Sequence, residues 1–206
     1  EEDVQRYADY SDMMQMLVKQ WRMDWNDWNL PFLFVQLPMY LADGEKDDSY
    51  WALQREQQYI ASMMIQNAGM ISLADCGEYD NIHPLDKKTP GERLFQLAKN
   101  LVYDKQGTIT ATAAQLFSDN GKLYVTFDHL HEKLVMQTAN GCPFEISGED
   151  NLFYPAKADV IHGNMLCISN PAVKFPSAVK YAWYNFGEAA LFTESGNPVS
   201  PFFKCV

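Results

Sequence analysis

The distribution of apolar and polar residues divides the chain into two halves. Up to about residue 104, stretches with apolar residues every three or four positions alternate with short, uninterrupted apolar runs, which is the pattern of helices and strands that build a parallel sheet. Beyond Gly107, apolar and polar residues alternate with a period of two, and pairs such as Asn120-Gly121 suit hairpin turns. We therefore expect an α/β domain over residues 1–104 and an antiparallel β-sandwich of about six to eight strands over residues 105–206.

The first half is predicted to contain helices that alternate with buried strands. Apolar residues that include Trp21 and Trp25 form one stripe along the first helix. The third helix has a strong start sequence, in which Thr89 is the expected N-cap, Pro90 opens the first turn and Glu92 completes a capping box. The helices are expected over residues 4–26, 49–67 and 90–103, and the strands over residues 32–37 and 70–74.

Composition and charge narrow the range of partners. Of the 206 residues, 47% are hydrophobic, which is enough for a sizeable core. The net charge of -11 and the scattered bases argue against nucleic acid, and no run approaches the roughly 20 apolar residues that span a membrane. The four cysteines lie far apart without a Cys-x-x-Cys motif, so we expect no metal site and no cofactor.

One Asp-x-x-His motif stands out by its position. Such a spacing lets a carboxylate orient an imidazole from within one loop, and it occurs at Asp80–His83, Asp128–His131 and Asp159–His162. Ligands of open α/β sheets bind in the loops that follow the strands, and only Asp80–His83 follows a predicted strand and precedes a helix. We therefore interpret Asp80 and His83 as a catalytic pair and the other two motifs as coincidental.

The same loop also has a plain structural interpretation. Asp80 and His83 are equally compatible with a polar surface turn, because short motifs occur by chance. Asp75 and Glu78 add two carboxylates close to the strand end; these are either solvated loop acids or ligands of a metal or substrate.

Two glutamines are the candidates for substrate contacts outside this loop. Gln57 shares a helix face with Leu53 and Ile60, so we expect it on the buried side of its helix. A buried amide needs hydrogen-bond partners, so Gln57 either supports the site as a structural amide or contacts substrate, and Gln36 at a strand end has the same alternatives. Arg55 falls on the other face of the helix and is expected at the surface.

The order of motifs along the chain resembles that of the sialate O-acetylesterases. The resemblance covers nearly the whole sequence, and in this family an Asp-x-x-His-Pro loop is preceded and followed by characteristic segments. In the first half the matching segments are Gln20-Trp21-Arg22, Pro31 to Leu37, Arg55-Glu56-Gln57-Gln58, Asp80 to Pro84 with Lys87, and Gly91-Glu92-Arg93-Leu94. In the second half they are Phe144-Glu145-Ile146, Tyr154-Pro155-Ala156, Val179 to Trp183 and Gly196 to Phe202.

The resemblance implies a fold and an activity. The fold would be the C-terminal part of an SGNH-type, flavodoxin-like parallel-sheet hydrolase domain over residues 1–104, followed by a β-sandwich accessory region. The implied activity is that of a sialate O-acetylesterase, in which a serine attacks the acetyl ester of an O-acetylated sialic acid while His83 acts as the base and Asp80 as the acid of the triad. Such glycan substrates suggest a periplasmic or secreted protein.

The family's nucleophile has no counterpart here. It lies in a Gly-Gln-Ser-Asn-like turn far upstream, and none of the ten serines of this chain has the small neighbours of such a turn. We therefore expect the serine in an upstream part of the same protein, and we expect this chain alone to be inactive.

Two further functions remain open. In one, the chain is a non-catalytic carbohydrate-binding or structural fragment in which the second half carries the function. In the other, the esterase acts on acetylated xylan or another glycan. Tyr181 and Trp183 are expected on one face of a strand, where aromatic residues more often belong to a core than to a sugar-stacking surface.

Overall fold

The computed structural model describes residues 4–206, which form two compact units. The first unit comprises the described residues up to Ile109 together with Tyr184–Phe186, and the second comprises Thr110–Trp183 and Gly187–Val206. The expected mixture of an α/β part and an antiparallel β part is confirmed. Nothing in the sequence pattern indicated that Tyr184–Phe186 belong with the first unit.

The first unit is a small parallel sheet covered by helices. Strands β1 and β2 pair in parallel, with Phe32 opposite Ala68 and Val35 opposite Ile71. A helix lies between the two strands in the sequence, which is the crossover connection that parallel pairing requires. The elements are η1 (Val4–Asp9, a 3-10 helix), α1 (Tyr10–Asp24), β1 (Phe32–Val35), α2 (Tyr50–Met64), β2 (Ala68–Ile71) and α3 (Lys88–Leu101).

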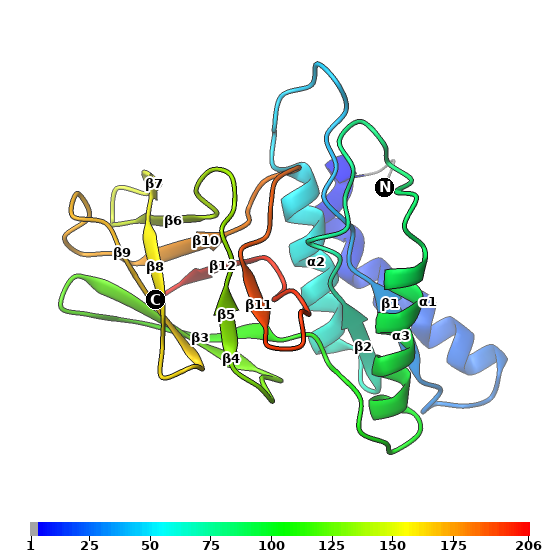
Figure 1. Ribbon diagram of the computed structural model, residues 1–206. Coiled ribbons are helices and arrows are strands. Elements are labelled where there is room, and N and C mark those ends of the chain that lie inside the picture. The colour runs from blue at the N-terminus through cyan, green and yellow to red at the C-terminus, as the bar shows by residue number, and fades with distance from the viewer. Residues whose placement is uncertain (1–3) are drawn as a thin grey trace. The chain divides into compact units, whose positions relative to one another are not determined.

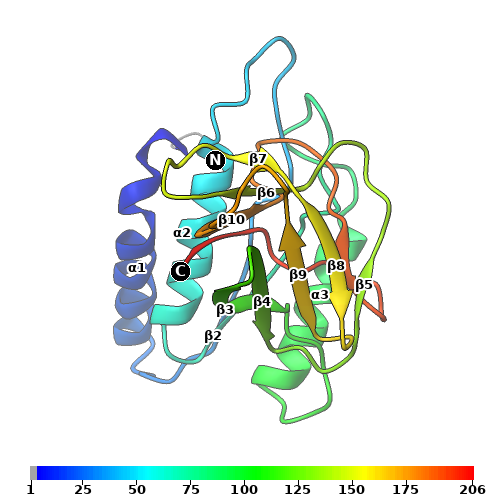
Figure 2. The same cartoon turned by 90° about the vertical axis from the view of Figure 1, so that its left-hand side faces the viewer.

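Two apolar clusters fix the helices on opposite faces of this sheet. On one face, Val18 of α1 and Ala61 of α2 pack with Phe34 and Met70. On the other face, Leu97 of α3 packs with Ile71 and its neighbours. Figures 1 and 2 show α1 running alongside α2. Burial of each large apolar side chain contributes roughly 1.5–3 kcal/mol, so the clusters place the C-terminal ends of β1 and β2 securely between the helices.

The apolar stripe predicted for the first helix is only partly buried. Val18 is 2% exposed, whereas Trp21 and Trp25 are 47% and 76% exposed. Arg22 lies inward instead, because the segments that follow α1 and α2 contain main-chain carbonyl groups that need hydrogen-bond donors. Its guanidinium donates to the carbonyl of Leu30 at 3.0 and 2.9 Å and to that of Gln66 at 2.7 Å.

The third helix begins two residues earlier than predicted, and its cap is a different residue. Asp86 Oδ1 accepts the main-chain N–H groups of Lys88 at 2.9 Å and of Thr89 at 3.0 Å. These bonds satisfy two of the donors that a helix N-terminus leaves without an intrahelical partner. The prediction of Thr89 as the N-cap was therefore wrong, although a side-chain oxygen does cap the helix. Glu92 forms an exposed ion pair with Lys88 at 3.6 Å.

The second unit is entirely antiparallel in its strand pairing. One four-stranded sheet has the order β12-β10-β6-β7 and the other β3-β4-β9-β8, while β11 and β5 form a ribbon (Figures 1 and 2). The face-to-face sandwich remains a prediction. The strands are β3 (Thr112–Asp119), β4 (Lys122–Asp128), β5 (Leu134–Met136), β6 (Phe144–Ser147), β7 (Tyr154–Pro155), β8 (Lys157–Ile161), β9 (Met165–Ser169), β10 (Ala178–Tyr181), β11 (Leu191–Thr193) and β12 (Phe202–Cys205).

Aromatic residues form the centre of the second unit. The ring of Tyr181 stacks on that of Phe144, with centroids 4.7 Å apart, and contacts that of Phe202 at 5.3 Å. Its hydroxyl accepts the main-chain N–H groups of Ala190 and Leu191. Tyr181 is fully buried and Trp183 is 8% exposed, so the prediction that both are core residues is confirmed.

Candidate functional site

The predicted catalytic histidine lies at a cavity where the two parallel strands end. The cavity has a volume of about 290 Å³, close to the lower end of the range of small-molecule sites. Leu37 and Leu73 follow the C-terminal ends of β1 and β2, and His83 and Asp86 come from the loop between β2 and α3. The position predicted from the sequence, outside the C-terminal edge of a parallel sheet, is therefore where the cavity lies.

The two members of the predicted pair share this loop without bonding to each other. Asp80 has a left-handed backbone (φ 56°), and its Oδ1 accepts the main-chain N–H of Asp43 at 2.9 Å. His83 is exposed, and its main-chain N–H donates to Asn81 Oδ1 at 3.1 Å. Within residues 4–206 the imidazole has no hydrogen-bond partner. The roles of Asp80 and His83 in catalysis thus stay a prediction.

Glu78 holds the His83 loop in place through two hydrogen bonds. Its Oε1 accepts the main-chain N–H of Leu85 at 2.7 Å, and its Oε2 accepts the side-chain amide of Asn81 at 2.6 Å. Both hydrogen bonds favour the charged carboxylate and hold the pKa of Glu78 below its ordinary value. Because the two bonds span the residues on either side of His83, Glu78 fixes the shape of the turn that presents the imidazole.

Asp75 ties the third helix to the end of β2. Its two carboxylate oxygens accept Nη1 and Nη2 of Arg93, both at 2.7 Å. This fork-to-fork arrangement is the strongest geometry for such a pair. Arg93 Nη1 also donates to the carbonyl of Ser72 at 3.0 Å. Asp75 and Glu78, for which the sequence left open solvated acids or ligands, both have structural partners.

The one thiol in the cavity is unsuited to act as a nucleophile. Cys76 lines the cavity beside His83. Burial, reinforced by the neighbouring carboxylate of Asp75, raises the pKa of Cys76 to about 12. The thiolate is the nucleophilic form of cysteine, and at neutral pH it is essentially absent from this site.

A glycine allows the His83 loop to pack against the chain that follows β1. A Cβ built on Gly77 would lie 1.9 Å from the carbonyl oxygen of Met39, closer than any real contact. Tyr79 then donates its hydroxyl to Asp43 at 3.1 Å. The His83 loop and the chain that follows β1 therefore hold each other in place.

The structure reverses the predicted orientation of α2. Its buried face contains Arg55 and Gln58, while Gln57 is only half-buried. Gln58, the neighbour of the predicted residue, accepts the main-chain N–H of Leu37 at 2.8 Å and donates to the carbonyl of Val35 at 3.3 Å. These bonds continue the hydrogen bonding of β1 beyond its last paired residue, which explains why an amide rather than Leu53 faces inward.

Arg55 was predicted at the surface, and this was wrong: the residue is 1% exposed. Its guanidinium donates to the carbonyl of Pro38 at 3.4 Å and to that of Tyr184. Removal from water outweighs the favourable field of Tyr184 and Asp47 and lowers the pKa of Arg55 to about 10.

Gln36 belongs to the same buried group. It is completely buried, and its Nε2 donates to the main-chain carbonyl of Arg55 at 3.2 Å. A substrate contact by Gln36 or by the half-buried Gln57 remains a prediction.

Asn185 lies far along the sequence but hydrogen-bonds to the chain after β1 and to the start of α2. Its main-chain carbonyl accepts the N–H of Tyr40 at 2.8 Å, and its side-chain Oδ1 accepts the N–H of Trp51 in the first turn of α2 at 3.0 Å. In return it donates to the carboxylates of Asp47 at 2.7 Å and Asp48 at 2.9 Å. No periodicity could have revealed a cap that comes from 134 residues further along the chain.

The two other Asp-x-x-His motifs lie in the second unit. His162 has a left-handed backbone (φ 53°) in the turn between β8 and β9, and Asp159 pairs with Lys157 at 3.0 Å. His131 follows β4 in an exposed segment. Neither motif lies at the end of a parallel strand, in keeping with the interpretation that both are coincidental.

The described residues show neither a metal cluster nor a membrane-spanning helix. Across residues 4–206, no three His, Cys, Asp or Glu side chains are grouped so as to hold a metal ion. In the same range, every helix is too short or too polar to cross a bilayer. All four cysteines lie in this part of the chain, and each is a free thiol.

A solved structure resembles this chain closely. No known protein-family profile matches the sequence, and no curated protein matches it. The crystal structure of a carbohydrate acetylesterase from Xanthomonas citri superimposes with a TM-score of 0.87 and 32% sequence identity. The alignment covers 95% of this chain and 46% of that protein. The chain therefore spans a little less than half the length of this relative.

Proposed function

We propose that the His83 site belongs to a carboxylic ester hydrolase that removes acetyl groups from carbohydrates. The observation that carries this proposal is the likeness to the carbohydrate acetylesterase, which extends over 95% of the chain at 32% identity. The position of His83, at a cavity beyond the C-terminal ends of β1 and β2, is where such a fold would need a general base.

In the proposed mechanism, His83 accepts the hydroxyl proton of a serine as the serine oxygen attacks the acetyl carbonyl. The imidazolium then returns the proton to the departing sugar oxygen, and water releases acetate from the acyl-enzyme by the same route. Asp80 would orient the imidazole. Hydrogen bonds between catalytic groups are often long or misaligned without substrate and tighten in the complex, so Asp80 would have to exchange the Asp43 amide for His83.

The proposed mechanism also needs a serine and donors to the oxyanion. We propose that the serine and the oxyanion donors come from an upstream part of the same protein, and that this chain alone is inactive. The finer proposal for the substrate is an O-acetylated sialic acid, which would suit a periplasmic or secreted protein. An acetylated xylan or another glycan is the alternative, and the likeness to a carbohydrate acetylesterase is equally compatible with it.

The test uses the whole protein and compares two histidines with the same motif. Hydrolysis of 4-nitrophenyl acetate and of acetylated sialic acid and xylan should fall by about 10²- to 10⁴-fold in His83→Ala, the usual contribution of a positioned base. His131→Ala is the matched control, since His131 is also exposed and also follows an aspartate by three residues. It should leave turnover unchanged. Equal activity of the two variants would refute the role of His83, and the preferred substrate would decide between the two glycans.

A further inference from the structure

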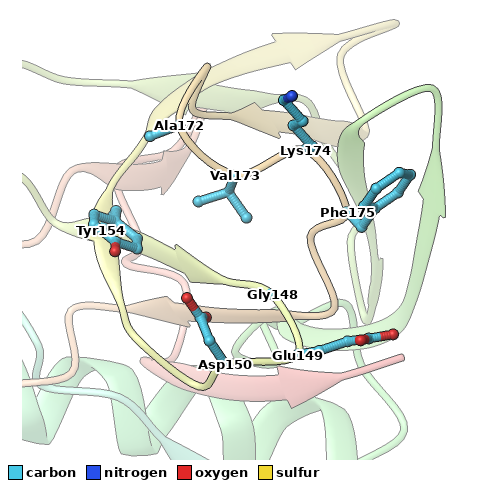
Figure 3. A pocket seen from close by; sticks show the side chains of 8 residues that line it. All are labelled: Gly148, Glu149, Asp150, Tyr154, Ala172, Val173, Lys174 and Phe175. Atoms are coloured by element: carbon cyan, nitrogen blue, oxygen red, sulfur yellow. The ribbon is translucent and has the colours of Figure 1, made fainter.

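The second unit contains a larger cavity that the proposed chemistry does not use. Its volume is about 630 Å³, and it is lined by the loop between β6 and β7 and the loop between β9 and β10. In Figure 3, Tyr154 and Phe175 lie on opposite sides of the opening, and Val173 lies between them. The carboxylate of Asp150 is directed toward the middle, whereas the ring of Phe175 is directed outward (Figure 3). Its size falls within the range of small-molecule sites.

Hydrogen bonds hold the two loops in place. Asn170 donates its side-chain amide to the carbonyl of Pro155 at 2.7 Å, and the N–H of Ser177 donates to the carbonyl of Ser147 at 2.9 Å. A Cβ built on Gly148 would lie 3.2 Å from the carbonyl oxygen of Phe175, so the loops approach each other closely at that glycine. The cavity is therefore formed before any ligand arrives, which lowers the cost of binding.

The two aromatic side chains at this cavity differ from its floor in exposure. Phe175 is 82% exposed and Tyr154 is 37% exposed, whereas Val173 at the floor is 7% exposed. An exposed phenylalanine contributes little to folding, and aromatic residues beside a concave surface are typical of binding sites.

The polar groups point to a hydroxyl-rich ligand without negative charge. Asp150 Oδ1 accepts the N–H of Leu152 at 3.1 Å, and its Oδ2 has no partner within the described chain. An ionised carboxylate is an acceptor only, so it is suited to ligand hydroxyl groups. Glu149 adds a second carboxylate against the single ammonium of Lys174, and this excess of negative charge disfavours an anionic ligand.

We propose that this cavity binds a neutral sugar unit of a glycan chain. Tyr154 contacts one apolar C–H face of the sugar, Val173 forms the floor, and Asp150 accepts hydrogen bonds from its hydroxyl groups. The 82% exposed ring of Phe175, directed outward in Figure 3, turns inward over the bound sugar. The site would hold a polysaccharide on the protein independently of ester hydrolysis. The inference rests on the proposed function only for the choice of polysaccharides as probes.

The experiment measures binding without an ester. The whole protein is run in native gels that contain deacetylated xylan or glucomannan, and the retardation gives a dissociation constant for each polysaccharide. Because these probes carry no acetyl group, the result does not depend on whether His83 is catalytic. Phe175→Ala tests the stacking, because a side chain that is 82% exposed can be removed without unfolding the loop. Asp150→Asn tests the charge and keeps an acceptor for the N–H of Leu152.

We expect at least one neutral polysaccharide to retard the wild-type protein, and both variants to raise its dissociation constant by at least about tenfold. Phe117→Ala is the control, since Phe117 is a 42% exposed phenylalanine of the same unit that stacks on Tyr124 instead of lining the cavity. It should bind like the wild type. A sialylated oligosaccharide should bind more weakly than the neutral chains. The proposal is overturned if no neutral polysaccharide binds, or if Phe175→Ala and Asp150→Asn bind as well as Phe117→Ala.

Discussion

The buried guanidinium of Arg55 permits a prediction that separates charge from packing. Burial lowers its pKa from the ordinary value to about 10, which means that the folded protein disfavours the charged group by about 3 kcal/mol relative to water. Against this stand hydrogen bonds to the carbonyls of Pro38 and Tyr184, and removing the donor from a buried carbonyl costs about 1–3 kcal/mol. Pro38 retains a second donor, Trp51 Nε1. The cost of burying the charge and the cost of removing these hydrogen-bond donors are therefore nearly equal.

Arg55→Met should therefore change the free energy of unfolding by no more than about 1–2 kcal/mol, because methionine fills the volume of the arginine stem. Arg55→Ala should cost about 3–5 kcal/mol, because it leaves a cavity in addition. Urea unfolding followed by tryptophan fluorescence measures both, since four of the five tryptophans lie at or before residue 51. Arg6→Met, at an arginine whose side chain is 63% exposed, should stay within about 0.5 kcal/mol.

The reasoning fails if Arg55→Met is as destabilising as Arg55→Ala. Such a result would mean that the charged head stabilises the fold by more than its desolvation costs, and that packing around its stem contributes little.

Two further predictions concern the His83 loop. Gly77→Ala should lower turnover of an acetyl ester by the whole protein at least tenfold, because its Cβ would displace either Met39 or the loop. Gly91→Ala is the control and should retain activity, because the added Cβ has no neighbour within 4 Å. Equal activity of the two variants would contradict the close approach of Gly77 to Met39. For Glu78, whose folded-state pKa is depressed, the hydrogen bond to Leu85 is complete above pH 4.5 and is lost as the pH falls below that value through the depressed pKa. Amide exchange at Leu85, corrected for its intrinsic pH dependence, should show this loosening in the wild type and no such step in Glu78→Gln.

The order of helices and strands in the first half was predictable because it depends on local periodicity. Strand, helix and loop follow one another near the expected positions, and the loop with His83 was found by its place after β2. Orientation about the helix axis was not predictable in the same way. Periodicity assigns the inward face to apolar residues such as Leu53, but the chain beyond β1 needs hydrogen-bond donors and acceptors, and Gln58 and Arg55 supply them.

The hydrogen-bond partner of Asp80 could not be predicted from the sequence either. A spacing of three residues brings Asp80 and His83 into one loop, but the direction of each side chain depends on contacts with another loop. Asp43, 37 residues earlier, provides the amide that Asp80 accepts. The burial of Arg55 was not predictable from periodicity either, because periodicity places this residue on the helix face opposite Leu53.

The contribution of Tyr184–Phe186 to the first unit has a consequence for the time course of folding. Arg55 and the first turn of α2 receive partners from residues 129 and 134 positions further along the chain. Contacts of such long range form late, because closing a long loop costs entropy before any contact is gained. During synthesis, β1, β2 and their helices emerge before Tyr184–Phe186, and Arg55 lacks its partner until these residues have been made. Until then the end of β1 beside the His83 cavity lacks its inner support, so a competent site should form only after Tyr184–Phe186 have been synthesised.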